Sequence, residues 1–343
     1  MPARRRGSSR GGTGAVRMAS EFELIRKYFT RPAKRAVLGV GDDCALIGVT
    51  PGYELAISTD MLVAGTHFLP DTDPKRLGHK TLAVNLSDLA ATGAEPRYAL
   101  LSLALPNADE AWIAAFAAGF FALADRFGVE LIGGDTTRAA PGGALALNVT
   151  IIGETPVGGA VRRSGAKAGD DVWVSGTLGD AALGLAALKG QVVLRGEDRE
   201  FCLGRLEIPT PRIELGLKLR GIAHAMLDIS DGLAGDLAHL ASASGVTAQV
   251  DADALPLSPA VRRETREATL RYALGGGDDY ELCFAAAPEA RTEVEAAGTA
   301  SGVAVARIGT ILAGRGGAPV TYADASGNVL ALQLGGYDHF GTA

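Results

Sequence analysis

Short apolar runs alternate with longer helical segments along most of this chain, and this alternation constrains its fold more than any other feature. Runs typical of β-strands occupy residues 53–59, 97–105, 129–134, 144–154, 170–176 and 223–229. Helical patterns occupy residues 75–92, 109–127, 179–189, 210–221 and 231–243, and several of them end at a glycine that can cap the helix. Because the two kinds of segment are mixed throughout, we expect an α/β protein.

The chain is long enough for about two domains of ordinary size. Gly, Pro and Arg cluster in IIGETPVGGAVRRSGAKAGD, residues 151–170, between two predicted strands. We therefore place a boundary near residue 155 and expect α/β domains over 21–155 and 156–343. Residues 1–20 are basic and rich in Gly and Ser, without the apolar segment of a secretion signal, and are predicted to form a disordered tail.

Composition excludes several classes of partner. The net charge of -6 argues against nucleic acid, since affinity for polyphosphate depends on Lys and Arg. The longest apolar run, residues 111–124, is shorter than the roughly 20 residues that span a membrane. The 3 cysteines are far apart and lack CxxC spacing, so neither a disulfide framework nor a zinc site is predicted, and a cytoplasmic location is expected.

Aspartate recurs where apolar strands end or helices begin, flanked by small residues. The positions are Asp43 in GVGDDCAL, Asp60 after an apolar strand, Asp88 in a helix, Asp135 after two glycines, Asp228 and Asp231 in LDISDG, and Asp278 in GGGDDY. A single Gly-Asp pair is most often a turn, and Asp231 alone reads equally well as a helix cap. So many carboxylates in one cleft would require cations, and oxygen ligands with few histidines select Mg²⁺ when phosphate is also bound.

Phosphate binding would have to use these metal ions. The chain has no GxxxxGK[ST] loop and no kinase-type glycine-rich loop with its lysine. Metal ions, glycine backbone amides and an occasional arginine remain as phosphate ligands. Among the five histidines, His67 is set apart by its position shortly after the Asp60 strand.

Eight motifs, in order, resemble the thiamine-monophosphate kinase family of the aminoimidazole ribonucleotide synthetase superfamily. They are GVGDDCAL, ISTDMLVAGTHFLPDTDP, KTLAVNLSDLAATGAEP, LIGGDTTR, RRSGAKAGD, LDISDGLAGDLAHL, GGDDYELCF and GYDHF. The resemblance runs from about Glu21 to Phe340. It implies an N-terminal domain that forms a β-barrel with a second subunit, a C-terminal α/β domain, and a site in the cleft between the domains.

The resemblance also implies an activity, which is transfer of the γ-phosphoryl group of ATP to thiamine monophosphate in a homodimer that binds several Mg²⁺ ions. No dedicated catalytic base is expected, because the acceptor phosphate is already anionic. Two polyanions must instead be neutralised and aligned for in-line transfer.

Site residues follow from the matching positions. Those that match the family's magnesium ligands are Asp43, Ser58, Thr59, Asp60, Asp88, Asp135, Asp228 and Asp231. The ATP contacts would be Gly134, Asp135, Arg163 and Ser230. The contacts to thiamine monophosphate would be His67, Asp278 and Tyr337. Members often carry Glu then Asp where this chain has Asp278 and Asp279. In the first acidic pair, Asp42 and Asp43, we expect Asp43 to bind metal. We expect Asp42 to shape the turn or to accept hydrogen bonds from backbone amides.

Two alternatives stay open. Another ATP-using synthetase of the superfamily is less consistent with the motifs: the N-terminal tail has no Cys-Lys pair, as selenophosphate synthetase would require, and no cysteine ends the chain, as the hydrogenase maturation factor would require. The second alternative is a metal and nucleotide sensor that keeps the cleft but does not catalyse phosphoryl transfer. Turnover that depends on thiamine monophosphate would distinguish an enzyme from a sensor.

Overall fold

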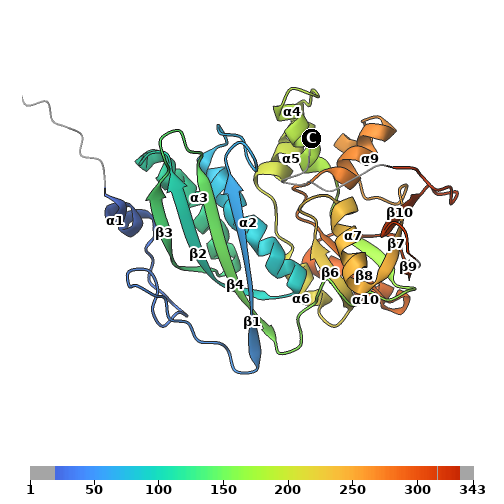
Figure 1. Cartoon of the computed structure of the whole chain (residues 1–343), viewed down its shortest axis with the longest axis horizontal. Coiled ribbons are helices and arrows are strands. Elements are labelled where there is room, and N and C mark those ends of the chain that lie inside the picture. The colour runs from blue at the N-terminus through green and yellow to red at the C-terminus, as the bar shows by residue number, and fades with distance from the viewer. Residues whose placement is uncertain (1–19, 315, 333–343) are drawn as a thin grey trace, which may run out of the picture.

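The computed structural model describes residues 20–314 and 316–332. The predicted tail, apart from Ser20, and Tyr337 therefore lie outside the described residues. Two α/β units lie side by side, each with its own sheet (Figure 1). The expected mixed α/β architecture is confirmed. No described helix is long and apolar enough to cross a membrane.

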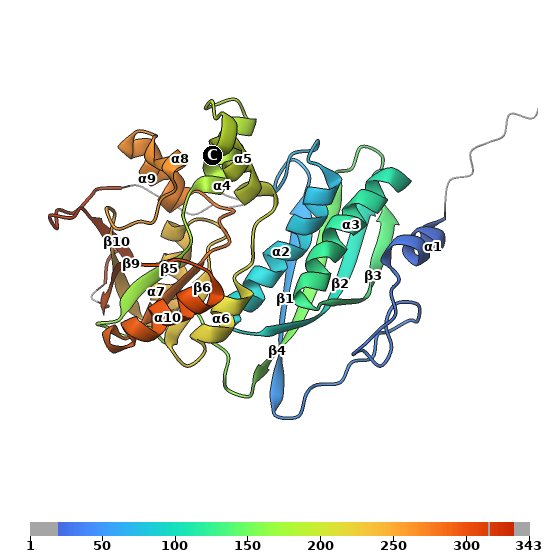
Figure 2. The ribbon, with the colours of Figure 1, turned by 180° about the vertical axis from the view of Figure 1, so that it is seen from behind.

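The N-terminal unit is an open sheet of 4 strands in the order β1-β4-β2-β3, with helices on one face (Figure 2). Strand β4 pairs antiparallel with both β1 and β2, whereas β2 and β3 are parallel. The strands are β1 (Tyr53–Val63), β2 (Glu95–Leu105), β3 (Glu130–Arg138) and β4 (Ala146–Pro156). The helices are α1 (Glu21–Leu24), the π-helical turn η1 (Ile25–Phe29), α2 (Pro74–Thr92) and α3 (Glu110–Phe127).

The C-terminal unit is a sheet of 6 strands in the order β10-β7-β9-β5-β8-β6. Its strands are β5 (Asp171–Ser175), β6 (Ala223–Asp228), β7 (Val246–Asp251), β8 (Leu282–Ala286), β9 (Val305–Ala313) and β10 (Val320–Ala323). Its helices are α4 (Asp180–Leu188), α5 (Gly196–Glu207), α6 (Ile213–Leu219), α7 (Leu233–Ser244), α8 (Pro259–Arg262), α9 (Arg266–Gly275), the 3₁₀ turn η2 (Pro288–Ala290) and α10 (Arg291–Ser301).

Helix α2 is shared by the two units, because it packs on α3 and β1 on one side and on α6 and β6 on the other. Glycines permit both contacts. A Cβ atom at Gly119 of α3 would lie 1.8 Å from the carbonyl oxygen of Lys75, and one at Gly216 of α6 would lie 2.0 Å from that of Ala90. These close backbone approaches fix α2 against both units, so the side chains of α2 are held rigidly at their junction.

Candidate active site

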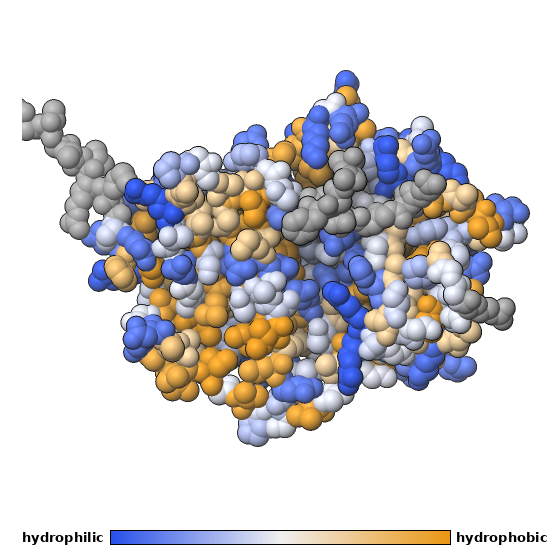
Figure 3. Space-filling view, viewed as in Figure 1, coloured by the Kyte–Doolittle hydropathy of each residue, from blue (hydrophilic) through white to orange (hydrophobic). Residues whose placement is uncertain are grey.

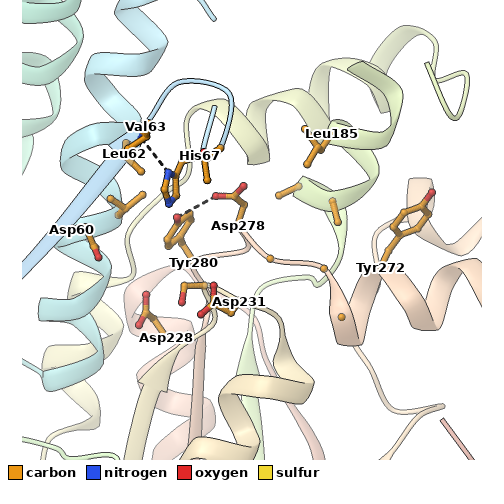
Figure 4. A pocket seen from close by; sticks show the side chains of 18 of the residues that line it. Asp60, Leu62, Val63, His67, Leu185, Asp228, Asp231, Tyr272, Asp278 and Tyr280 are labelled. Carbon is orange, nitrogen blue, oxygen red and sulfur yellow. Dashed lines mark hydrogen bonds between the residues drawn. The ribbon is translucent and has the colours of Figure 1, made fainter. Parts of the chain in front are cut away.

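A cavity of about 810 Å³ lies between the two units. Its walls come from the end of β1, one side of α2, helix α4, the turn after β6 and the segment 275–280 (Figure 4). Eight of the predicted site residues line it: Asp60, His67, Asp88, Arg163, Asp228, Ser230, Asp231 and Asp278. The fold thus brings together residues that are far apart in the sequence.

One end of the cavity is acidic. Strand β1 contributes Asp60, helix α2 contributes Asp88, and Asp228 ends β6. Alternation along β1 directs Ser58 and Asp60 toward α2, where the Ser58 hydroxyl donates a 2.6 Å hydrogen bond to Asp88 Oδ2. The Asn85 side chain accepts from the Asp60 backbone N–H at 3.1 Å. Polar side chains of α2 therefore hold the strand and the helix in register beside the cavity.

Burial and mutual repulsion raise the pKa values of these acids. Burial, with the charges of Asp88 and Asp231, raises the pKa of Asp60 to about 7. Burial, with Asp88 as the largest repelling charge, raises the pKa of Asp228 to about 8. The pKa of Asp88 is also raised by burial, although the Ser58 hydrogen bond and Arg163 oppose the shift. The carboxylates are thus held close enough to disfavour one another's charge.

The donor set suits a hard divalent cation. Within the described residues, Asp60, Asp88 and Asp228 form no ion pair with Lys, Arg or His. Oxygen-only donors that form no ion pair, with only the nearby charge of Arg163 to offset Asp88, fit Mg²⁺, which keeps waters and substrate phosphates among its ligands. Across residues 20–314 and 316–332, no three His, Cys, Asp or Glu side chains converge as a ready-made cage. Ligands from phosphate would therefore have to complete the coordination.

The turn after β6 is positioned by a residue that sequence reasoning missed. Asp236, in the first turn of α7, accepts from the backbone N–H groups of Ser230 and Asp231, each at 3.1 Å. It is buried, and burial raises its pKa to about 7. The pair Gly235-Asp236 in SDGLAGDL was the available signal, but it lies inside a predicted helix and was not distinguished from a surface position.

His67 and Asp278 line the cavity next to the acidic residues (Figure 4). The Nδ1 atom of His67 accepts a 3.0 Å hydrogen bond from the Val63 backbone N–H, so the ring of neutral His67 carries its proton on Nε2 (Figure 4). The Asp278 carboxylate contacts Lys80 Nζ at 2.9 Å and the Tyr280 hydroxyl at 3.1 Å. Neither Lys80 nor Tyr280 was predicted to belong to the site.

The two side chains of the second acidic pair, Asp278 and Asp279, point in different directions. Asp278 lines the cavity, whereas Asp279 is fully buried on the other side of the segment and accepts from the Gly179 backbone N–H. Arg205 donates to the Asp279 carbonyl oxygen and to Glu281, which anchors the segment beneath the cavity. Neighbouring side chains of this segment therefore face the cavity and the protein core.

Besides Ser58, which bonds the cavity-lining Asp88, four predicted residues do not reach this cavity within one chain. Thr59 faces the other side of the sheet, where its hydroxyl donates to the Val149 carbonyl oxygen at 3.1 Å. Gly134 and Asp135 lie in the edge strand β3, at the far side of the sheet from β1. Asp43 lies in an exposed loop, and its backbone N–H donates to Asp42 Oδ1 at 2.8 Å. The expectation that Asp42 accepts from backbone amides is confirmed.

Both halves of the chain match models of one family. Residues 41–155 match the model described as AIR synthase related protein, N-terminal domain, and residues 167–321 match its C-terminal domain. The thiamine-monophosphate kinase of Salmonella typhimurium is 46% identical over 94% of this chain and 98% of its own length. The chain belongs to the thiamine-monophosphate kinase family.

Solved structures of thiamine-monophosphate kinases share this fold. The enzyme of Stenotrophomonas maltophilia K279a has a TM-score of 0.78 and 47% identity, covering 84% of this chain and 91% of its own. AaThiL, solved in complex with AMPPCP and TMP, has a TM-score of 0.74 and 31% identity, covering 85% and 89%. The hydrogenase maturation protein HypE of E. coli has the fold at a TM-score of 0.77, with 26% identity over 93% and 97%. Among these structures, identity favours the thiamine-monophosphate kinases over HypE.

Proposed function

We propose that this chain phosphorylates thiamine monophosphate with ATP, giving thiamine diphosphate and ADP. The observation that carries the proposal is the cavity between the units, which brings a group of carboxylates together with His67 and Asp278. Thiamine-monophosphate kinases 45% and 46% identical to the chain, and AaThiL in complex with AMPPCP and TMP, support it. The carboxylates suit the metal-bound phosphates, and His67 and Asp278 suit the organic part of the acceptor.

Asp60, Asp88, Asp228 and Asp231 would hold magnesium ions, with Ser58 orienting Asp88. Bound Mg²⁺ neutralises the phosphates of both substrates and stabilises the charge that develops during transfer. Arg163 and the Ser230 turn would face the ATP phosphates, and Asp236 fixes that turn through two backbone hydrogen bonds. No residue needs to take a proton from the acceptor, since its phosphate is ionised near neutral pH.

Apolar side chains also line the cavity. Leu62 and Val63 of β1 face Ala182 and Leu185 of α4 across it. An apolar wall of this kind would hold the rings of thiamine, while His67 and Asp278 provide polar contacts. Tyr337, the third expected acceptor contact, stays a prediction.

We further infer that the active enzyme is a homodimer in which the N-terminal sheets of two chains close a barrel. The face of the sheet opposite α2 and α3 exposes apolar groups, visible in orange over the strands in Figure 3, and Ile57 and Met61 of β1 are 61% and 56% exposed there. Both sheet edges, β1 and β3, are unpaired within the described part of the chain. In such a dimer, the apolar face would be covered and both open edges would be paired.

The strand register indicates what the partner would supply. Asp135 pairs with Ser102, Ser102 with Asn148, and Asn148 with Met61, next to Asp60. Three strand spacings therefore separate Asp135 from β1, roughly 14 Å. If β3 of one chain lies beside β1 of the other, Gly134 and Asp135 of the partner reach the Thr59–Asp60 edge. The remaining predicted ATP and metal residues would then complete the site.

The domain ranges 21–155 and 156–343, and a cytoplasmic location, remain proposals. The family models, over 41–155 and 167–321, support the division of the chain into these two units. Unpaired cysteines at positions 44, 202 and 283 support a reducing compartment.

The direct test measures steady ADP release by the purified chain with Mg²⁺ and ATP, with and without thiamine monophosphate. We expect release that depends on the acceptor. A sensor would bind nucleotide and metal without such release, and that result at saturating Mg²⁺ and ATP would overturn the proposal.

A further inference from the structure

A buried lysine joins the two units beside Asp278, one of the residues proposed to contact the acceptor. The Lys80 side chain of α2 is only 4% exposed, and its Nζ atom lies 2.9 Å from Asp278 Oδ1. Lysine is almost never buried unless it is paired. The ion pair connects the N-terminal unit to the segment 275–280 of the C-terminal unit, next to the cavity wall.

Asp278 is held in an unusual conformation. Its φ angle is 68°, in the left-handed region, and that of Tyr280 is 49°. Non-glycine residues in this region cost of order 1–3 kcal/mol and often occur at ligand sites. The Asp278 backbone N–H donates to the Ser230 carbonyl oxygen at 2.8 Å, which ties the segment to the turn beside the acidic end.

The two contacts to the carboxylate leave one oxygen available. Lys80 and the Tyr280 hydroxyl both contact Oδ1. No other described side chain donates to Oδ2, and the Asp278 side chain is 27% exposed toward the cavity. A smaller chamber of about 80 Å³, lined in part by Lys80, His67, Leu185 and Asp278, adjoins it.

We propose that Lys80 is a positioning residue for the acceptor: it fixes Oδ1 of Asp278, so that Oδ2 faces the cavity and accepts from the cationic, amino-bearing organic part of the acceptor. This inference rests on the proposed function. Lys80 is not among the residues that line the larger cavity, and its ammonium group is directed at Asp278, so its role runs through that carboxylate. Its removal therefore weakens acceptor binding and leaves the ATP end unchanged.

The test compares steady-state kinetics of Lys80→Met and Lys80→Arg with those of the wild type. For Lys80→Met we expect the KM for thiamine monophosphate to rise about 10- to 100-fold, the loss of one well-placed contact to a charged group, with kcat and the KM for ATP within about threefold. Lys80→Arg, which keeps the charge, should restore most of the affinity.

Arg76→Met is the matched control. Arg76 lies on the same helix and also joins it to the C-terminal unit, through a 2.5 Å ion pair with Glu207, but it does not contact Asp278. If Lys80 acted only by holding the units together, Arg76→Met would raise the same KM, and that result would overturn the inference. We expect the KM of this variant to match the wild type.

A double variant checks that Lys80 acts through Asp278. Asn is one of the few residues that tolerate the left-handed conformation, so Asp278→Asn should fold. Lys80→Met combined with Asp278→Asn should raise the KM no further than Asp278→Asn alone, and additive effects would contradict the inference. If Lys80→Met does not fold, Lys80→Gln provides the same comparison. An inactive wild type would overturn the proposed function, whereas an active wild type with an unchanged KM in Lys80→Met overturns this inference alone.

Discussion

The Ser58 hydroxyl donates a 2.6 Å hydrogen bond to Asp88 Oδ2, and this contact joins β1 to α2 at the acidic end of the cavity. It opposes the burial that raises the pKa of Asp88. The strand and the helix therefore present their carboxylates to one space.

Loss of the hydrogen bond from Ser58 to Asp88 should weaken magnesium binding. In Ser58→Ala, Asp88 loses a donor that favours its charged form, so we expect the Mg²⁺ concentration for half-maximal activity to rise several-fold. A magnesium titration of the rate measures this shift. Ser301→Ala removes a hydroxyl that donates within α10, and should leave the titration unchanged. A Ser58→Ala enzyme with the wild-type magnesium dependence would contradict the assignment.

Asp60 should be essential for turnover but not for folding. Asp60→Asn removes a half-buried carboxylate that Asp88 and Asp231 repel, so the metal-free variant should be at least as stable as the wild type. Its kcat should fall at least about 100-fold, since a metal ligand is lost. Thermal denaturation and steady-state kinetics on the same preparation separate the two effects. Near-normal turnover would contradict the assignment of Asp60 as a metal ligand.

The metal-free protein should lose stability as the pH rises. Asp60, Asp228 and Asp236 have folded-state pKa values of about 7, 8 and 7. An unfolded aspartate titrates near 3.9, so between about pH 4 and 8 the folded state binds protons that the unfolded state does not. Stability contributed by these groups is therefore complete below pH 4 and is lost by about pH 8.

Thermal denaturation in chelator at pH 5.5 and pH 8 measures this dependence. Glu130 and Glu154 have lowered pKa values and so act in the opposite direction, but only below about pH 4.5. With nucleotide present, added Mg²⁺ should raise the Tm most at pH 8, where the carboxylates are charged. A Tm that does not respond to magnesium at either pH would contradict a metal site here.

Mixed dimers test whether the partner supplies Asp135. Asp60→Asn and Asp135→Asn should each be inactive, because both residues serve every site. After the two variants are unfolded and refolded together, half of the dimers are mixed and each has one intact site, so about a quarter of the wild-type activity should return. If Asp60 and Asp135 served the same site from one chain, no activity would return.

Much of the N-terminal unit could be predicted from the sequence. The apolar runs at 53–59 and 97–105 lie within β1 and β2, and the pattern at 75–92 corresponds to α2. The C-terminal half was predicted less completely: α5, α8, α9, α10 and strands β7 to β10 were missed. Helix α5, GEDREFCLGRLE, is highly charged and buries only one narrow side, so its pattern does not stand out from a loop.

Motifs predicted most of the site, because Asp60, Asp88, Asp228 and Asp231 lie in or next to elements that converge. They could not show which face of β1 carries Thr59, nor that β3 lies at the opposite edge, since strand order depends on pairing between distant segments. Lys80 was missed for a related reason. A lysine in a helical pattern is usually solvent-exposed, and only the packing of α2 between the two units reveals its burial.

The most direct test of the account follows the transferred group itself. The purified chain is incubated with Mg²⁺, thiamine monophosphate and ATP labelled at the γ-phosphate, and the products are separated. We predict that the label appears in the terminal phosphate of thiamine diphosphate, in a one-to-one ratio with ADP. Label recovered only as inorganic phosphate, or not released from ATP at all, would contradict the account.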